Sequence, residues 1–546
     1  MKKLYTLIIL SSVTFFLSCK KEFLDINTDP NNPSVAEIGL LLPSTQVAIT
    51  TGLTSNLSDA AAAFADQTHS ATWGRWLQNN GDFNDDWKSM YSGALPDIEL
   101  IISSATASGA RGFVGIAKIE KAYMFSVLVD LFGDVPYFEA GKSQNAKFDN
   151  GELIYNEVFT LLEEGIATLS ASSKSALPID KVAATSDIIY KGDQVKWLKF
   201  ARSLKLKLYN QIRLYNPQLA KDSIMSLIKT PTTLIALNSE DGQFQFGGTS
   251  NPPTGHPLWF RNYTGGKSGL LSNFFIHKLV YGNTTNMKDP SVYPAEVRYD
   301  VKDPRTRYYF FRQYISGPIA ASALPCDYNN VVTCKYGYQG QGYLGRDRGD
   351  NSVGPADGAL RSTYGIYPVG GLFDSDVAKA VGSTDGKGSG IFPFMTNFGV
   401  SFIRAEAALT LATGEDPKKL LESGIRASIQ KVIDFGTANG SVAAALIPSA
   451  ADITTYVNAV LAKYDGAADD TQKLEIIIDQ SHTAWYGNGV EAYNNLRRTG
   501  FPVLMPPTNP SRSDVPLRVI LPIAETAANA NAPKGDLTNT PVFWDK

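Results

Sequence analysis

The sequence predicts a mainly α-helical protein that folds as a single large domain. Apolar residues recur at three- and four-residue steps over long stretches, which is the period of an amphipathic helix. With 546 residues, of which 43% are hydrophobic and 19% charged, the chain can bury a large core. No Pro/Ser-rich linker or run of like charge divides it into parts. We therefore expect one helical domain rather than a string of small ones.

The clearest single helix is expected to begin after Asp193. Its apolar positions include Trp197, Phe200 and Leu204, and lysines occupy the positions between them. Asp is a favoured N-cap residue because its carboxylate accepts hydrogen bonds from free backbone N–H groups of the first turn. The dipeptide at 216–217, Asn-Pro, is expected to end this helix.

Other helical stretches suggest that the helices come in pairs. Apolar residues crowd more than one face from Phe113 to Phe132, so this helix should be packed on several sides and end at Gly133 and Pro136. Amphipathic stretches also run over 153–169, 402–412 and 420–433, and Asp416-Pro417 can open the last of these. The spacing resembles tetratricopeptide-like helix pairs, although no strict sequence period is present.

The middle of the chain has a different composition. Residues 238–390 are rich in Gly, Pro, Asn and Tyr and contain few long periodic helices, in contrast to 35–235 and 398–500. We therefore predict a long loop-rich insertion, and long irregular segments of compact proteins are usually functional.

The amino terminus has the pattern of an export signal. Two lysines precede an apolar stretch that is too short to span a bilayer, and residues 1–18 are expected to form a signal peptide. The sequence Phe-Leu-Ser-Cys at 16–19 resembles a bacterial lipobox, which makes Cys19 the expected site of lipid attachment. An ordinary secretory signal with an incidental cysteine is the alternative.

The remaining cysteines are Cys326 and Cys334, separated by a polar, turn-rich spacer. In an exported protein the two thiols can form a disulfide that closes this loop, and we favour that interpretation. A zinc site is the competing interpretation, but two thiols without neighbouring histidines make a poor one.

Charge and motifs exclude several function classes and leave one enzyme class open. The net charge of −3, without a basic cluster, argues against nucleic-acid binding. The chain lacks the His-Glu-x-x-His and Gly-x-Ser-x-Gly strings, and its four histidines, at 69, 256, 277 and 482, are far apart in sequence. Glycoside cleavage stays open, because it needs only two suitably spaced carboxylates.

A weak cation site is conceivable in the segment 345–358. Asp347, Asp350 and Asp357 lie there among glycines and supply the oxygen ligands that calcium prefers. Their spacing differs from that of an EF-hand, and a solvated turn-rich loop is the preferred interpretation, so we predict neither a cofactor nor a metal.

Several segments together resemble the SusD-like (SusD/RagB) outer-membrane lipoproteins of Bacteroidetes, and the resemblance runs nearly from end to end. It is carried by the following strings: Phe-Leu-Asp-Ile-Asn-Thr-Asp-Pro-Asn-Asn-Pro at 23–33, Asp-Leu-Phe-Gly-Asp-Val-Pro-Tyr at 130–137, Tyr-Lys-Gly-Asp at 190–193, Arg-Ala-Glu-Ala at 404–407, and Arg-Arg-Thr-Gly-Phe-Pro at 497–502. The last string is the strongest signal. Basic Lys20 and Lys21 depart from the acids that often follow the lipidated cysteine in surface-exported members.

The resemblance implies a nutrient-binding domain over 19–546 that is lipid-anchored in the outer membrane and faces the cell exterior. It implies a protein that binds oligosaccharide, or in some members peptide, as the lid of a SusC-like TonB-dependent transporter in nutrient uptake, and that catalyses nothing. The recurring motifs themselves read as scaffold, and the arginines at 497–498 are expected to form buried or docking ion pairs. A glycan-cleaving lipoprotein and a helical-repeat protein-binding scaffold are the alternatives.

The ligand contacts have to be predicted from residue chemistry. Aromatic rings stack on sugar faces, and amides, Arg and Asp bond to hydroxyl groups. Two segments combine these types. The predicted ligand residues are Trp73, Arg75, Trp76, Asn79, Asp82 and Asn84, followed by Trp259, Arg261 and Tyr263. For each of them, packing within the fold is the alternative role.

Overall fold

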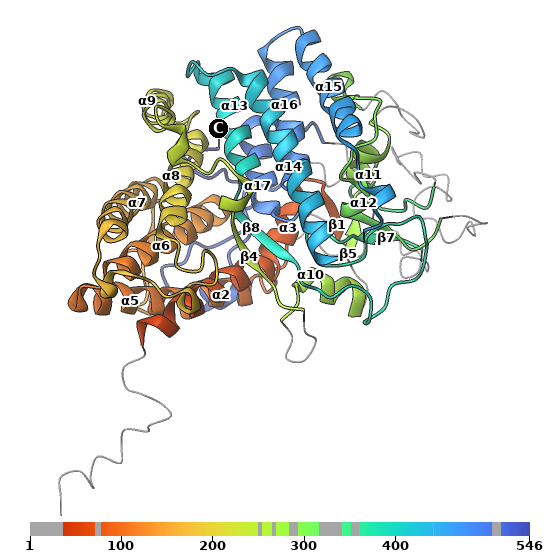
Figure 1. Ribbon diagram of the computed structural model, residues 1–546. Coiled ribbons are helices and arrows are strands. Elements are labelled where there is room, and N and C mark those ends of the chain that lie inside the picture. The colour runs from red at the N-terminus through yellow and green to blue at the C-terminus, as the bar shows by residue number, and fades with distance from the viewer. Residues whose placement is uncertain are drawn as a thin grey trace, which may run out of the picture.

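A computed structural model describes residues 37–70, 78–248, 254–264, 269–282, 293–315, 341–350, 360–440, 442–504 and 515–545 (Figure 1). The signal segment 1–18, Cys19, the two loop cysteines Cys326 and Cys334, and Asp357 lie outside these residues. The predictions made for them therefore stay predictions.

Long helices form the first half of the molecule. They are α2 (Ile38–Thr54), α3 (Leu57–Phe64), α4 (Asn84–Lys88), α5 (Leu95–Ser108), α6 (Arg111–Phe132), α7 (Gly151–Lys174), α8 (Gln194–Gln211) and α9 (Pro217–Ile228). Helix α6 is buried along nearly its whole length, as its crowded apolar faces predicted. It ends at Gly133, whose φ of 81° suits glycine.

Helices α6 and α7 pack closely because glycines face each other where they meet. A Cβ atom on Gly115 would lie 2.9 Å from the Leu169 Cβ, and one on Gly165 would lie 3.1 Å from the Gly115 carbonyl oxygen. The absence of side chains at these two positions lets the helix backbones approach each other, so the pair forms a close antiparallel unit.

Helix α8 begins as predicted but ends earlier. The Asp193 carboxylate accepts hydrogen bonds from the backbone N–H groups of Val195 and Lys196, which fixes the N-terminus. The prediction that 216–217 ends this helix is wrong, because α8 stops at Gln211. Asn216 instead caps the next helix, and its side chain accepts a hydrogen bond from the Leu219 N–H. Asn-Pro can stop one helix or start another, and here it starts α9.

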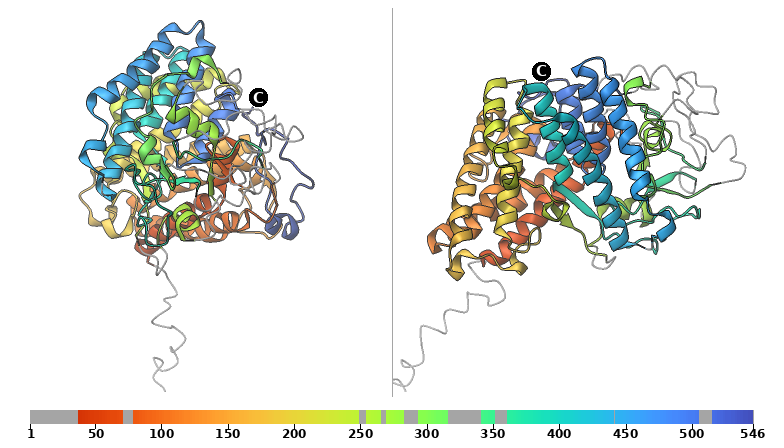
Figure 2. Two further views of the ribbon diagram at one scale, coloured as in Figure 1. Left: turned by 90° about the vertical axis from the view of Figure 1, so that its right-hand side faces the viewer. Right: turned by 45° about the horizontal axis from the view of Figure 1, so that its top comes forward.

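Helices dominate the last part of the chain as well. They are α13 (Asn397–Leu411), α14 (Pro417–Asn439), α15 (Ala450–Gly466), α16 (Asp470–Ala484), α17 (Gly489–Thr499) and the short α18 (Ile523–Ala528). Asp416 caps α14 as predicted, and Gly424 of α14 packs against the ring of Phe402 on α13. The helices of the two halves stand side by side in the right-hand view of Figure 2, where α8 contacts α13.

Where the structure describes the middle of the chain, it contains only short elements. The α-helices described there are α10 (Pro257–Trp259), α11 (Asn273–Val280) and α12 (Thr306–Tyr309). The described strands are β1 (Thr68–Ser70), β2 (Val135–Pro136), β3 (Phe148–Asp149), β4 (Gly242–Gln245), β5 (Gly269–Leu271), β6 (Phe310–Arg312), β7 (Ser362–Tyr364) and β8 (Ile391–Met395). Within the described residues they pair two by two and antiparallel, as β1–β5, β2–β3, β4–β8 and β6–β7. The predicted mainly α fold with a loop-rich middle is confirmed.

Two hydrophobic clusters form the core. One joins the N-terminal helices α2 to α8 to the end of the chain, including buried Trp544. The other joins the loop-rich middle to α13 to α16 and is rich in tyrosine. Both clusters draw residues from α13 and β8, so these elements tie the two halves into one domain.

The arginines at 497–498 lie in the interior, as expected of scaffold residues. Arg498 forms a buried ion pair with Glu406 of α13, with Nε–Oε1 and Nη2–Oε2 distances of 2.7 Å. Arg497 donates to backbone carbonyls of Asp130 and Leu517, and so holds α6 and the C-terminal segment against α17. Gly500 then ends α17 with a φ of 78°.

Candidate ligand-binding site

The structure brings the two predicted ligand segments together at Asn56. This residue lies in the short connection between α2 and α3. Its side-chain amide donates to the Asp82 carbonyl at 2.7 Å, and its side-chain oxygen accepts from Arg261 Nη2 at 3.3 Å. Residues more than 170 positions apart in the printed sequence thus meet at one amide. We call Ser55, Asn56, Asp59, Asp82 and Arg261 the Asn56 junction.

Arg261 is the central cation of the junction. Its guanidinium donates to the Asp59 carboxylate and, at 3.0 Å, to the Ser55 carbonyl. The Arg261 side chain is 26% exposed, whereas that of Asp59 is 7% exposed. Asp59 therefore anchors the guanidinium from the protein side, and part of the group faces solvent with N–H donors to offer.

The residues around Asp82 form a tight polar turn. The Asp82 carboxylate accepts from the Asn79 N–H at 3.0 Å, and the Asn79 side-chain oxygen accepts from the Gly81 N–H at 3.1 Å. Asn84, at the start of α4, accepts from the Ala524 N–H at 3.0 Å and so binds the C-terminal segment. Asn79 is the exposed member of the three, while Asn84 already serves the packing of the chain end.

Trp259 and Tyr263 are core residues in this structure. Trp259 is 3% exposed and Tyr263 1% exposed. The Trp259 indole donates to the Asp385 carbonyl at 2.9 Å, and the Tyr263 hydroxyl donates to the Tyr364 carbonyl at 2.7 Å. Both rings therefore pack within the fold, which was the alternative role considered for them. Arg261 is the member of this segment that faces solvent.

Trp73, Arg75 and Trp76 lie in 71–77, outside the described residues. The flanking residues are placed. Strand β1, which precedes 71–77, pairs with β5 in the register Thr68 with Leu271, and Gln78, which follows it, accepts from the Ile520 N–H at 2.7 Å. Asn79 comes directly after Gln78, so the segment with the two indoles leads straight into the turn of the junction.

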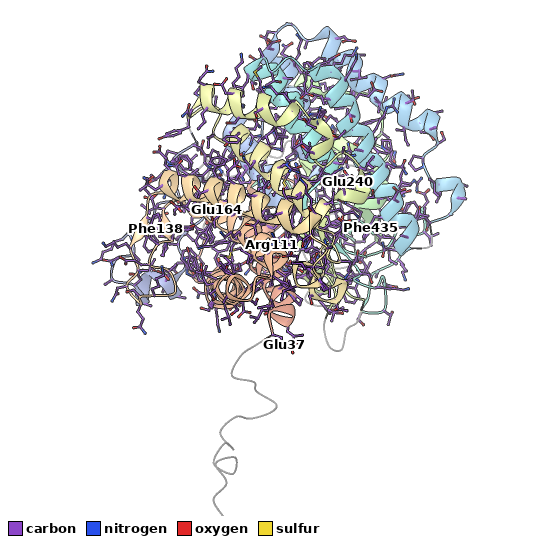
Figure 3. The ribbon with its side chains drawn as sticks, turned by 60° about the vertical axis from the view of Figure 1, so that its left-hand side comes forward. Glu37, Arg111, Phe138, Glu164, Glu240 and Phe435 are labelled. Carbon is purple, nitrogen blue, oxygen red and sulfur yellow. The ribbon has the colours of Figure 1, made fainter. Side chains whose placement is uncertain are left out.

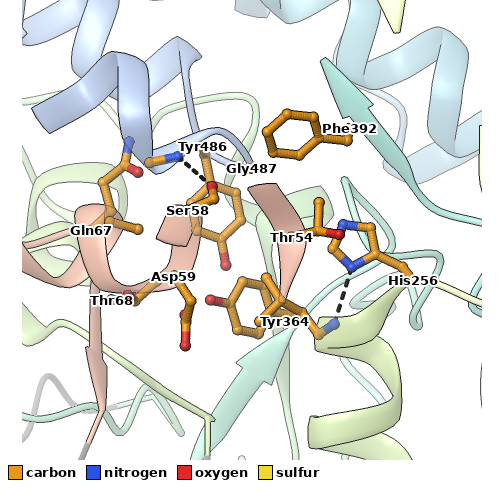
Figure 4. A pocket seen from close by; sticks show the side chains of 13 residues that line it. Thr54, Ser58, Asp59, Gln67, Thr68, His256, Tyr364, Phe392, Tyr486 and Gly487 are labelled. Carbon is orange, nitrogen blue, oxygen red and sulfur yellow. Dashed lines mark hydrogen bonds between the residues drawn. The ribbon is translucent and has the colours of Figure 1, made fainter. Parts of the chain in front are cut away.

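A small cavity lies behind the junction, with Asp59 on its wall (Figure 4). The free space is about 20 Å³, enough for one or two water molecules and too small for a sugar ring. Figure 4 shows Asp59, Tyr364 and Tyr486 on one side and His256 on the other. His256 Nδ1 accepts from the Leu258 N–H, and burial lowers the pKa of this imidazole to about 3, so the ring is neutral. The cavity therefore borders the junction through Asp59 but is not itself the place for a sugar.

The predicted acidic loop does not assemble a metal site in the part of the chain that is described. Asp347 accepts from the Asn273 amide at 2.7 Å, and Asp350 pairs with Arg346 at 3.0 Å. Among the described residues no three His, Cys, Asp or Glu side chains gather as metal ligands. The two placed aspartates thus have protein partners, an amide for Asp347 and a guanidinium for Asp350.

Sequence reasoning missed Ser55, Asn56 and Asp59. The string Ser-Asn-Leu-Ser-Asp at 55–59 has the residue types of a helix start, and it does precede and open α3. A short polar break between two apolar helices was the available signal, but it carries no information on the distant arginine that it holds.

Comparison with known proteins places this fold in a defined class. Solved structures match over almost the whole chain. A chitin-binding protein has 21% identity and a TM-score of 0.68, with 93% of this chain and 100% of that one covered. A SusD/RagB family protein from Bacteroides thetaiotaomicron has 18% identity and a TM-score of 0.68, with 93% and 99% covered. A chitin-binding SusD homolog from Flavobacterium johnsoniae has 18% identity and a TM-score of 0.65, with 93% and 98% covered. At these identities the likeness establishes the fold.

Family models carry the assignment further. The model described as starch-binding associating with outer membrane matches residues 30–317, more than half of the chain, and the model described as Susd and RagB outer membrane lipoprotein matches residues 377–524. The chain therefore belongs to the SusD/RagB family of outer-membrane lipoproteins. A search of curated proteins gave no match.

Proposed function

We propose that the protein captures oligosaccharide at the cell surface without cleaving it, and delivers it as the lid of a SusC-like TonB-dependent transporter. The observation that carries the binding part is the Asn56 junction, which gathers a guanidinium, the Asp59 carboxylate and an amide at a partly exposed position. Family membership supports the same class of ligand, since one matching model is described as starch-binding and two similar solved structures are titled as chitin-binding.

The chemistry of the junction suits a neutral polyhydroxylated ligand. Guanidinium N–H groups donate to sugar hydroxyls, and carboxylate and amide oxygens accept from them. Trp73 and Trp76, which lead into the junction, are the rings that we propose to stack on a sugar face. Because Asp59 compensates the charge of Arg261, the junction does not favour an anionic ligand strongly.

Binding of soluble oligosaccharides by isothermal titration calorimetry tests the site. A panel of starch-type and chitin-type oligosaccharides is titrated into the full mature chain. Arg261→Ala removes charged hydrogen bonds worth about 1.5–3 kcal/mol, so the affinity should fall about 10- to 100-fold. The Trp73→Ala/Trp76→Ala double variant should lose binding to a similar or greater extent.

A matched control separates the site from general effects of charge. Arg426 lies on the surface of α14, where it pairs with Glu422 and its side chain is 40% exposed. Arg426→Ala should bind like the parent. Equal affinities of Arg261→Ala and Arg426→Ala would disprove the role of the junction, and a parent chain that binds no member of the panel would count against glycan capture.

The transporter partner is tested separately by affinity purification from detergent-solubilised outer membrane. A TonB-dependent barrel recovered in near-equal amount with the tagged protein would support the lid. Its reproducible absence, with Cys19 acylated, would favour a free-standing binding protein.

A further inference from the structure

A buried cluster of polar side chains joins helix α2 to the core. Glu120 of α6 lies beside Thr45 and Gln46 of α2, with an Oε2–Thr45 Oγ1 distance of 2.6 Å and an Oε1–Gln46 Nε2 distance of 2.9 Å. The same Gln46 amide donates to Asp187 Oδ1, also at 2.9 Å. All four side chains are at most 4% exposed. The cluster is separate from the Asn56 junction and has no part in the proposed binding of glycan.

The single hydroxyl proton of Thr45 bears on the protonation state of Glu120. The Gln46 side-chain oxygen accepts from the Ile188 N–H at 2.8 Å, which fixes the orientation of its amide and turns both N–H groups toward the two carboxyls. Thr45 Oγ1 lies 2.7 Å from the Leu42 carbonyl oxygen as well as 2.6 Å from Glu120. A hydroxyl has one proton and cannot donate to both. A proton on Glu120 satisfies both contacts, because Glu120 then donates to Thr45 and Thr45 donates to Leu42.

Asp187 is the partner that carries the negative charge. It accepts from Gln46, from the Trp197 indole at 2.8 Å and from the backbone N–H groups of residues 189, 190 and 192. Five donors around one carboxyl are the environment of an anion. A second charge on Glu120 would face this anion across the shared Gln46 amide, so the pair favours one proton on Glu120.

We propose that Glu120 is a protonated hydrogen-bond donor at neutral pH, and that this proton makes the attachment of α2 to α6 sensitive to pH.

The surroundings of Glu120 support a neutral group. A cavity of about 30 Å³ borders it, and besides Gln46 and Glu120 its lining is apolar and aromatic: Ile49, Tyr123, Ile189, Trp197, Phe200 and Phe394. The titratable groups that face it are Asp187 and the phenol of Tyr123, whose own pKa burial raises. Burial raises the pKa of Glu120 to about 8, with hydrogen bonds that Thr45 and Gln46 would donate to the ionised form opposing the shift and the charge of Asp187 adding to it.

The direction of the effect follows from linkage. When α2 opens, Glu120 meets water and returns toward its ordinary pKa of 4.5. The closed state therefore holds a proton that the open state has lost over the pH range between these two values. The attachment is strongest below about pH 4.5, weakens by up to about tenfold per pH unit as pH rises, and levels off above about pH 8.

Glu37 is the first described residue of the chain and directly precedes α2 at one edge of the molecule, as Figure 3 shows. A pH-dependent α2 would change how firmly the domain holds the segment on which the predicted lipid anchor lies.

Hydrogen exchange of the α2 amides, measured at pH 5.5, 6.5 and 7.5 and corrected for intrinsic exchange, tests the proposal. The opening constant of the parent should rise by up to about 100-fold across this range. Glu120→Gln keeps a donor for Thr45 and an acceptor for Gln46 but cannot ionise, so its α2 amides should show a flat profile. Glu475→Gln is the matched control: burial raises the pKa of Glu475 on α16 to about 7, yet it should leave the profile of α2 unchanged.

A second measurement does not depend on a variant. Infrared spectra of the unsubstituted protein at neutral pH should contain the carbonyl stretch of protonated buried carboxyls, and part of this band should disappear with a midpoint near pH 8. The difference spectrum between the parent and Glu120→Gln assigns that part. A wild-type slope retained in Glu120→Gln, or no carboxyl band lost by that substitution, would overturn the proposal.

Discussion

Glu406 provides the sharpest test of what holds the two halves together. It is 1% exposed, and it accepts from Arg213 Nε at 2.9 Å and from Arg498 Nε and Nη2 at 2.7 Å. Glu406→Gln leaves two buried guanidinium groups without a countercharge. Breaking a buried ion pair in this way costs about 3–5 kcal/mol. For a domain of roughly 500 residues the unfolding entropy is about 1 kcal/mol/K, so Tm should fall by about 3–5 °C.

The pH dependence of stability provides a second test of the Glu406 ion pairs. The two arginines outweigh burial and lower the pKa of Glu406 from 4.5 to about 2. A carboxyl with a depressed pKa stabilises the fold fully above its unfolded value, and this contribution is lost as pH falls from about 4.5 toward 2. Differential scanning calorimetry should show that loss in the parent and a smaller one in Glu406→Gln.

Arg404 serves as the control, since it lies on the same helix but pairs with Glu415 at a position where its side chain is 17% exposed. Arg404→Gln should cost about 1 kcal/mol or less. If Glu406→Gln melts within about 1 °C of the parent, or no lower than Arg404→Gln, the ion-pair argument is refuted.

Three further substitutions probe local structure, each measured by thermal or urea denaturation against the parent. Asp193→Ala removes the cap of α8 and should cost about 1 kcal/mol, whereas a neutral result would mean that the cap is replaced by water. Gly133→Ala forces a residue with a Cβ to a φ of 81° and within 2.7 Å of Arg518 Nη1, so a loss of about 1–3 kcal/mol is expected, and no loss would contradict the role of this glycine in ending α6. Phe125→Ala empties a fully buried site of α6 and should cost about 3–5 kcal/mol, while a loss below about 1 kcal/mol would show that the core relaxes to fill it.

Local signals in the sequence predicted much of the fold, because they act over a few residues. The Asp193 and Asp416 carboxylates accept hydrogen bonds from backbone N–H groups a few residues ahead, and Gly133 ends α6 at its own position. Because these effects are local, they can be predicted from the sequence alone. Asn216 shows the limit of this approach. Its side chain can accept from the N–H groups of a following helix, and Pro217 suits a first turn, but the same pair also follows helix ends.

The candidate site was harder to predict because it depends on contacts between distant residues. Residue chemistry predicted Trp259 and Tyr263 as ligand contacts, yet both rings are buried, with hydrogen bonds to the carbonyls of residues 385 and 364. Nothing near Asp59 in sequence indicates the partner 202 positions away that it holds. Arg261 and Asp82 were predicted from their chemistry, and only the tertiary structure shows that they meet at Asn56.

One assay tests the central claim, that this protein binds glycan and does not cleave it. An oligosaccharide that the mature protein binds is incubated with it at saturating concentration, and binding and the release of new reducing ends are followed in the same sample. The account predicts saturable binding with no increase in reducing ends over the blank, and with affinity lowered in Arg261→Ala. Reducing ends that accumulate with time and with protein concentration would contradict it and assign the chain to the glycan-cleaving class.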